Sequence, residues 1–189
     1  MTDILLFAAG LGTRMGTLTA HQPKPLVRVG GQTLIDHALA LTQVPSIGRR
    51  VINAHYKADQ LRHHLRDKAI TISDETDLLR DTGGGLRHAL PHLTGDPVMT
   101  LNTDAIWVGP NPIPLLQAAW REDMSCLLML VPHDHVQGHK GAGDFVADTD
   151  GRLRRARGAI YSGLQMVRRT GLDGISEDVF SMNRVWDDA

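Results

Sequence analysis

The sequence has little cysteine, few aromatic residues and no long apolar run, and each shortage excludes a class of protein. Cys126 is the single cysteine among 189 residues, so no internal disulfide forms, which fits a reducing compartment. Aromatic residues make up 4 % and the net charge is −1, which does not favour binding to nucleic acid or to an anionic membrane. No run approaches the roughly 18 apolar residues of a membrane span. We therefore expect a cytoplasmic protein with no nucleic-acid or membrane partner.

The N-terminus also lacks the features of a secretory signal peptide, because Asp3 interrupts it and its apolar run covers only Ile4 to Ala9. The remaining composition, 42 % apolar and 22 % charged residues, is ordinary for a globular protein and excludes collagen-like and disordered chains. A chain of this length can bury one sizeable core, so we expect one domain. Cys126 lies in the apolar run SCLLMLV, which favours a buried structural thiol over a reactive one.

Three familiar phosphate-binding or catalytic motifs are missing as well. The dinucleotide fingerprint G-x-G-x-x-G, started at Gly10, would need glycine where Met15 stands. No lysine follows a glycine in the frame of a P-loop, and no G-x-S-x-G nucleophile elbow occurs. The sequence therefore gives no support for a dinucleotide enzyme, a P-loop NTPase or a serine hydrolase.

Short apolar runs alternate with amphipathic stretches over the first 132 residues. The apolar runs predict buried strands within 4–9, 49–54, 69–73, 97–105 and 125–132, and the stretches between them predict helices within 33–43, 58–67, 85–93 and 112–122. This order predicts a Rossmann-like, doubly wound α/β fold with a mixed, predominantly parallel sheet, helices on both faces and ligands at the carboxyl ends of the strands.

The pattern changes beyond residue 132. The stretch 144–167 predicts an antiparallel excursion that turns at Thr149-Asp150-Gly151. A last amphipathic helix is expected over 176–188, with Ser176 as its N-cap before two acidic residues.

The stretch LLFAAGLGTRMG, residues 5–16, carries three glycines around Arg14 directly after the first predicted strand. Glycine allows a sharp turn and lets a ligand approach the main chain, so exposed N–H groups would form an anion-binding concavity. Arg14 supplies a fixed charge suited to phosphate oxygens. Ten residues on, Pro23 and Pro25 flank Lys24 and hold it on a stiff, extended backbone, as a point charge for a phosphate. The alternatives are a glycine-rich turn with a surface arginine and a solvated lysine.

These two segments, together with DTGGG (81–85), LNTDA (101–105), GDF (143–145) and YSGLQ (161–165), occur in the order of a known family. The sequence resembles the sugar-1-phosphate nucleotidylyltransferases over nearly its whole length, and within them the uridylyltransferases acting on N-acetylmuramate 1-phosphate. The first leucine of the family's opening pattern is replaced by Phe7.

The resemblance implies that an NTP, with UTP favoured, and a sugar 1-phosphate give an NDP-sugar and pyrophosphate with the help of Mg²⁺. It implies catalytic roles for Arg14 and Lys24, and makes Asp104 the Mg²⁺ ligand. Asn102 and Asp144 would lie near the sugar phosphate. The nucleotide would contact the remaining implied residues, which are Ala9, Gly10, Leu11, Gly12, Thr13, Gly83 and Gly84.

Such a reaction needs residues of these types on independent grounds. The attacking phosphate oxygen is already anionic, so no strong general base is required, and the obstacle is bringing two polyanions together. Arg14, Lys24 and a Mg²⁺ supply positive charge where negative charge accumulates. Asp104 follows a buried strand, and a hard carboxylate suits Mg²⁺; the alternative is an aspartate that caps a turn.

The sequence departs from the family at its C-terminal end. The family holds Mg²⁺ with a second aspartate in a W-x-D-x-G strand, whereas VWDDA (185–189) is interpreted as the end of the last helix. We therefore expect residues 1–189 to form a single nucleotidyltransferase domain that lacks its C-terminal strand and helix and has an incomplete metal site.

Other functions stay open at this point. Mannose-1-phosphate guanylyltransferases are the main rival, and cytidylyltransferases and molybdopterin nucleotidyltransferases share the opening motif but place their lysine closer to the arginine. A non-catalytic nucleotide-binding module is the alternative of a different class. His133, His135 and His139 form a possible transition-metal cluster, although a loop beside the sugar is favoured. The arginines of RLRRARG (152–158) favour a solvated hairpin over a nucleic-acid patch.

Overall fold

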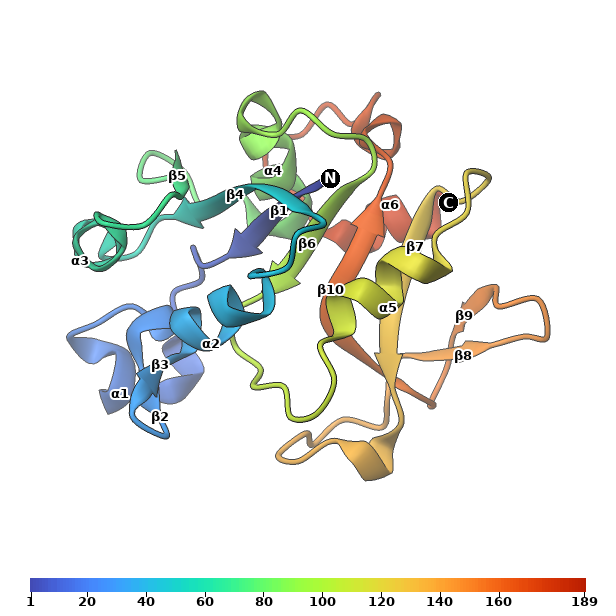
Figure 1. Cartoon of the computed structure of the whole chain (residues 1–189), viewed down its shortest axis with the longest axis horizontal. Helices are drawn as coiled ribbons and strands as arrows, with labels where there is room; N and C mark the ends of the chain where they lie inside the picture. Colours follow the sequence, from blue (N-terminus) through green and yellow to red (C-terminus); the bar gives the residue numbers. More distant parts are fainter.

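The computed structural model describes all 189 residues and has one central sheet of six strands (Figure 1). The strand order is β5-β4-β1-β6-β10-β7. β1 pairs in parallel with β4 and β6, and β4 with β5, while β10 runs antiparallel to both β6 and β7. The strands are β1 (Thr2–Phe7), β4 (Ile47–Ala54), β5 (Thr71–Asp74), β6 (Val98–Asn102), β7 (Cys126–Val131) and β10 (Ile160–Val167).

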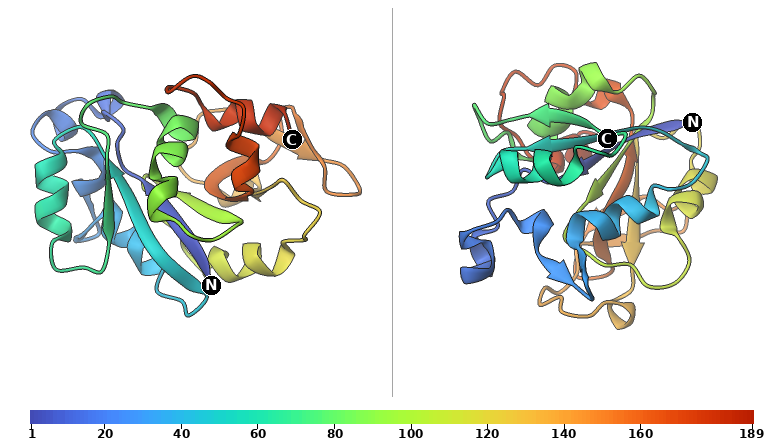
Figure 2. Two further views of the ribbon diagram at one scale, coloured as in Figure 1. Left: turned by 90° about the horizontal axis from the view of Figure 1, so that it is seen from above. Right: turned by 60° about the vertical axis from the view of Figure 1, so that its left-hand side comes forward.

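Helices cover both faces of this sheet, as the view from above in Figure 2 shows. One face packs against α2 (Leu34–Leu41), α3 (Ala58–Leu65) and α5 (Pro112–Ala119). The other face packs against α4 (Asp81–Ala89) and α6 (Met182–Asp187). Two-sided covering confirms the predicted doubly wound fold, and it explains why the central strands are apolar on both faces.

β1 shows the two-sided burial most clearly. Ile4 and Leu6 belong to the core beneath α2, α3 and α5, whereas Leu5 between them belongs to the core beneath α4 and α6, and all three are fully buried. Alternate side chains of a strand point to opposite faces, so an uninterrupted apolar run is what a central strand requires.

Smaller elements lie around the sheet. The hairpin of β8 (Phe145–Ala147) and β9 (Leu153–Arg155) is antiparallel, as predicted, and turns at residues 148–151. The hairpin of β2 (Arg28–Val29) and β3 (Gln32–Thr33) precedes α2, and the four-residue α1 (Thr17–Ala20) follows the glycine-rich stretch. No helix has the length or apolar character to cross a bilayer; the longest, α4, has nine residues.

The structure differs from expectation at β7, which was predicted to be buried. Every residue of this strand is only partly buried, because β7 forms one edge of the sheet. Cys126 at its start is nevertheless withdrawn from water enough that burial raises the pKa of its thiol to about 12. A thiol with such a pKa carries little thiolate at neutral pH, which agrees with the structural role predicted for it.

Two helices also begin at other residues than predicted. α4 starts at Asp81 and includes the three consecutive glycines, and a 3-10 turn, Leu90–His92, continues it past Leu90. α6 starts only at Met182, and its N-cap is Ser181, whose hydroxyl accepts a hydrogen bond from Asn183 N. Ser176 caps no helix, because the segment that follows it pairs with α4 instead.

Asp3, near the start of β1, connects this strand to β4 and to the loop before β6. It is buried, and its carboxylate accepts hydrogen bonds from Arg49 N (2.8 Å), Thr94 N (2.7 Å), Thr94 Oγ1 (3.0 Å) and Gly95 N (3.3 Å). Burial alone would raise the pKa of Asp3, but these four donors outweigh it and hold the pKa below its ordinary value. The ionised carboxylate therefore stabilises the fold.

We expect Asp3→Asn to lower the free energy of unfolding by about 1–3 kcal/mol at pH 7, because an amide turns one acceptor into a donor. The wild-type contribution is present above the unfolded pKa and is lost as the pH falls through the depressed folded pKa. Urea unfolding at pH 7 and pH 3 measures this. The difference in free energy of unfolding between wild type and variant should be smaller at pH 3 than at pH 7. Asp150→Asn on the β8–β9 turn serves as control. An equal free-energy difference at both pH values would contradict the stabilising role of the ionised Asp3 carboxylate.

Candidate active site

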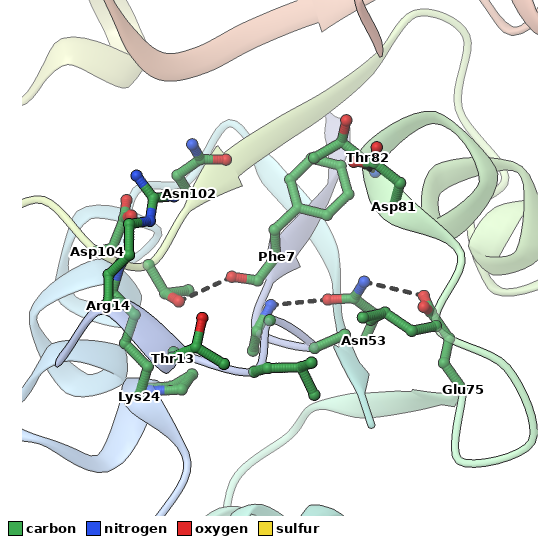
Figure 3. A pocket seen from close by; sticks show the side chains of 18 of the residues that line it. Phe7, Thr13, Arg14, Lys24, Asn53, Glu75, Asp81, Thr82, Asn102 and Asp104 are labelled. Atoms are coloured by element: carbon green, nitrogen blue, oxygen red, sulfur yellow. Dashed lines mark hydrogen bonds and ion pairs between the residues drawn. The ribbon is translucent and has the colours of Figure 1, made fainter. Parts of the chain in front are cut away.

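A pocket of about 570 Å³ opens at the carboxyl ends of β1, β4, β5 and β6, where the fold predicts ligands (Figure 3). Two groups of polar side chains face each other across Phe7. Arg14, Lys24, Asn102 and Asp104 lie on one side. The opposite side carries the polar side chains Asn53, Glu75, Asp81 and Thr82.

The glycine-rich loop from Ala8 to Met15 lines the pocket along its main chain. Gly12 lies in the left-handed region (φ 67°), and a 3-10 turn, Thr13–Met15, follows it. A Cβ at Gly12 would come within 2.9 Å of Thr19 Cγ2 and 3.0 Å of Lys24 Cβ. Gly12 is thus required both for its conformation and for the close packing of the loop on α1 and Lys24.

Lys24 and Asp104 form an ion pair of 2.7 Å between residues 80 positions apart. Lys24 begins a 3-10 turn, Lys24–Leu26, after an extended Pro23, so the lysine itself is not extended as predicted. Pro25 fits the start of this turn, where a missing N–H costs nothing. The side chains of the pair are 29 % and 45 % exposed, and an ion pair at this exposure contributes at most about 1 kcal/mol. Both groups can therefore exchange partners at low cost.

A series of buried hydrogen bonds lies on the opposite side of the pocket. Asn53, at the end of β4, accepts a hydrogen bond from Ala8 N (2.7 Å) and donates one to Glu75 Oε1 (2.9 Å). Glu75 is fully buried and accepts a second hydrogen bond from Arg80 N (3.3 Å). These contacts fix both ends of the Asn53 amide and tie the start of the glycine-rich loop to β4 and β5.

Sequence reasoning missed Asn53 and Glu75. The available signal was a polar residue near the end of each apolar strand, RRVINA and TISDE, at the edge where parallel strands present ligands. The same signal did identify Asp104 after β6, whereas Asn102, the last residue of β6, was indicated by the family resemblance. Thr103 between them donates to the carbonyl of Phe7 (2.7 Å) and so joins the ends of β6 and β1.

The structure brings most of the predicted site residues to one pocket. Its lining includes Arg14, Lys24, Asn102, Asp104 and the whole loop segment Ala9, Gly10, Leu11, Gly12 and Thr13. Three residues far apart in the chain, Arg14, Lys24 and Asp104, thus share the pocket that the proposed chemistry requires. Their catalytic and metal-binding roles stay predictions.

Gly83, Gly84 and Asp144 are not brought to the pocket. Gly83 N and Gly84 N both donate to the carbonyl of Phe180 (2.9 and 3.0 Å), so neither amide is open to a base. The Asp144 carboxylate accepts a hydrogen bond from Tyr161 N (2.8 Å) and ties the hairpin region to β10. Gly83 and Gly84 are buried, whereas Asp144 is exposed, and none of the three lines the pocket with the other predicted site residues.

No group of three histidine, cysteine, aspartate or glutamate side chains is arranged to hold a metal ion. His133 and His139 pack edge to face with ring centroids 5.6 Å apart, which gives the transition-metal alternative no support. Trp186 and Asp187 end α6, as interpreted from the sequence, and the Trp186 indole donates to Gln165 Oε1 (2.7 Å). On the side of the pocket that carries Arg14 and Lys24, Asp104 is the one carboxylate in the lining.

A glycine-rich loop after the first strand of a doubly wound sheet, faced by two cations and a carboxylate, defines a nucleotide-binding α/β protein. The chain belongs to the MobA-like NTP transferase domain family, whose profile matches residues 4–169. This family membership agrees with the resemblance to nucleotidyltransferases that the motifs predicted.

Among similar proteins is an N-acetylmuramate alpha-1-phosphate uridylyltransferase of Caulobacter vibrioides, 40 % identical over 160 residues. The match covers 79 % of this chain but only 66 % of that relative, so the chain spans slightly less than two thirds of its length. A protein of the same name from Neisseria meningitidis serogroup B is 30 % identical, with 90 % of this chain and 77 % of the relative covered.

Solved structures share the fold at lower identity. The inositol-1-phosphate CTP transferase from T. maritima aligns with a TM-score of 0.79 and 16 % identity, covering 100 % of this chain and 81 % of that one. HddC from Yersinia pseudotuberculosis, complexed with GMP-PN, aligns with a TM-score of 0.75 and 21 % identity, covering 96 % and 83 %.

We expect Asn53→Asp to destabilise the fold by about 2–4 kcal/mol at neutral pH, because it places a second carboxylate beside buried Glu75. Thermal and urea unfolding at pH 7 measures this loss of stability. Adding Glu75→Gln should restore most of the stability at neutral pH, since donor and acceptor are then exchanged. If Glu75→Gln did not restore the stability of Asn53→Asp, the proposed importance of the Asn53–Glu75 hydrogen bond would be refuted.

Proposed function

We propose that the protein transfers a uridylyl group from UTP to a sugar 1-phosphate, with N-acetylmuramate 1-phosphate as the favoured acceptor. The observation that carries the proposal is the convergence of Arg14, Lys24, Asp104 and the glycine-rich loop on one pocket. UTP and N-acetylmuramate 1-phosphate are favoured because the Caulobacter and Neisseria relatives are named for them and one is 40 % identical.

The two sides of the pocket indicate how an NTP would lie. Cations on the side of Arg14 and Lys24 suit the triphosphate, and the loop N–H groups suit its oxygens. The base would then lie toward Asn53, Asp81 and Thr82. Asn102 lies at the end of β6 on the same side as Arg14 and Asp104, where the acceptor phosphate would approach.

In the reaction, an oxygen of the sugar phosphate forms a bond to the α-phosphorus of UTP while the bond from that phosphorus to the β-phosphate bridging oxygen breaks. Pyrophosphate leaves with that electron pair, and no proton has to be removed from the nucleophile. Lys24 and Arg14 would hold the phosphates in line and neutralise the charge that gathers on their oxygens.

The residues present fit a Mg²⁺ that takes most of its ligands from phosphates and water. Asp104 is a hard oxygen donor, half-exposed in the pocket, and its partner Lys24 is itself a cation that a phosphate would attract. Mg²⁺ in phosphate-binding sites is held by one or two carboxylates together with phosphate oxygens. Asp104 would hold the ion, and the ion would neutralise phosphate charge and act as a Lewis acid.

Pyrophosphate release, measured for four NTPs against a panel of sugar 1-phosphates, tests the proposed function. We expect the highest rate with UTP and N-acetylmuramate 1-phosphate, and Lys24→Met to lower that rate by about 10²–10³-fold because one charge on the transferring phosphate is lost. Lys68→Met, in the turn after α3, is the matched control, because Lys68 also forms a partly exposed ion pair, with Asp36. Preference for GTP and mannose 1-phosphate would overturn the substrate, and nucleotide binding without turnover would indicate a non-catalytic module.

We also expect Asp104→Asn to abolish the gain in UTP affinity that Mg²⁺ gives the wild type, since the carboxylate is the protein ligand on that side. Titrating UTP with and without MgCl₂ by calorimetry measures this independently of turnover. The free energy of unfolding should change by less than about 1 kcal/mol, because the lost ion pair is half-exposed. An unchanged Mg²⁺ effect would remove Asp104 from the metal site.

A further inference from the structure

The segment Ile175–Met182, between the last strand and α6, reaches the nucleotide pocket through Val179. This residue lines the pocket together with Leu79, Asp81 and Thr82, about a hundred positions earlier in the chain, and is 49 % exposed. Val179 is therefore an apolar side chain on the side of the pocket assigned to the base, and no motif pointed to it.

The glycines of α4 form the platform on which this segment lies. A Cβ at Gly83 would collide with the Phe180 ring, and a Cβ at Gly84 would collide with the Asp178 carbonyl oxygen. Each glycine inside a helix costs about 1 kcal/mol relative to alanine. Close approach of the segment explains two of the three glycines in DTGGG, and Gly85 is required by Glu75 Oε1, which would lie 2.9 Å from a Cβ there.

Backbone hydrogen bonds then fix the segment in register. Phe180 O accepts from the N–H groups of Gly83 and Gly84, which have no partner inside the helix so near its start. Phe180 N donates to Arg80 O (3.3 Å), and Met182 N donates to Thr82 Oγ1 (2.9 Å). Val179 thus lies next to the most firmly held point of the segment.

Arg87, on the next turn of α4, holds the outer half of the segment. Its guanidinium donates to Ile175 O, to Glu177 O (2.5 Å) and to Asp178 Oδ1 (3.2 Å). The same group lies 5.0 Å from the centre of the Phe180 ring. One arginine side chain therefore spans four residues of the segment and faces away from the pocket, whose lining does not include it.

We propose that Ile175–Met182 forms the outer wall of the base end of the nucleotide pocket, with Val179 contacting the nucleoside and Arg87 as the positioning residue. The proposal rests on the proposed function, because it takes the ligand to be a nucleoside triphosphate. It predicts that the segment contributes to binding of the nucleoside and contributes nothing to binding of the phosphates.

Comparing UTP with inorganic triphosphate, both with Mg²⁺, separates these contributions. Val179→Ala should raise the Kd of UTP about threefold by removing apolar contact, and Arg87→Met should raise it about tenfold by releasing the wall. The Kd of inorganic triphosphate should stay unchanged in both. Arg87→Lys should recover part of the loss, since an ammonium reaches some of the same carbonyls. Val146→Ala on β8 and Arg66→Met after α3 are the matched controls.

Steady-state kinetics gives a second readout. A wall that acts on nucleoside binding raises KM for UTP in Arg87→Met and leaves kcat within about twofold. Equal weakening of UTP and inorganic triphosphate, or no change in either, overturns the proposal, and Val179→Ala decides the matter if Arg87→Met does not fold. Wild-type protein that binds UTP without releasing pyrophosphate refutes the proposed function but leaves this test intact. Wild-type protein that binds no UTP overturns both.

Discussion

The site depends on what happens where β1 ends. The central strand β1 is paired on both sides up to Leu6, with β4 and β6, and Phe7 is paired with β6 alone. At Ala8 the chain leaves the sheet and enters the glycine-rich loop, and a buried N–H without a partner would cost free energy at that point. Asn53 supplies the partner, and Glu75 fixes the orientation of the amide that does so. The loop therefore starts from a defined position, which gives its exposed N–H groups a fixed direction.

The same reasoning applies to the three glycines of α4. Propensity alone argues against a helix over DTGGG, and each glycine weakens it. The helix forms because packing compensates: Gly83 and Gly84 admit the segment 175–182, whose Phe180 carbonyl satisfies two amides at the helix start, and Gly85 admits Glu75. Tertiary contacts on two sides thus decide the local structure, and they place Asp81 and Thr82 at the pocket.

Local patterns in the sequence were sufficient for most of the fold. Apolar runs located β1, β4 and β6, and amphipathic spacing located α2, α3 and α5, because these signals reflect burial of the element itself. The partial burial of β7 depends on its place at the sheet edge, which no local pattern records. The N-cap of α6 was predicted five residues early, at Ser176 and not at Ser181, because Ser176 with two following acidic residues is a good cap signal locally. What overrides it is Arg87, roughly ninety residues away.

The pocket shows the same division. The residues themselves pointed to the loop after β1, to Lys24 between two prolines and to Asp104 after β6, whereas Asn102 was indicated by the family resemblance. Asn53 and Glu75 were missed, because their importance lies in partners 45 and 22 positions away. Gly83 and Gly84 were assigned to the base by resemblance, whereas their N–H groups already serve Phe180. Val179 became visible only when the fold brought residues 79–82 and 175–182 together.

The Lys24–Asp104 ion pair connects the electrostatics of the pocket to those of the proposed reaction. The proposed triphosphate and metal need charges of both signs, and Lys24 and Asp104 supply one of each, 2.7 Å apart. Because both side chains are partly exposed, the pair is weak enough to be replaced. A phosphate taking Lys24 and a cation taking Asp104 exchange one ion pair for two. The charges on the protein are conserved in this exchange, and binding needs no uncompensated buried charge at any stage.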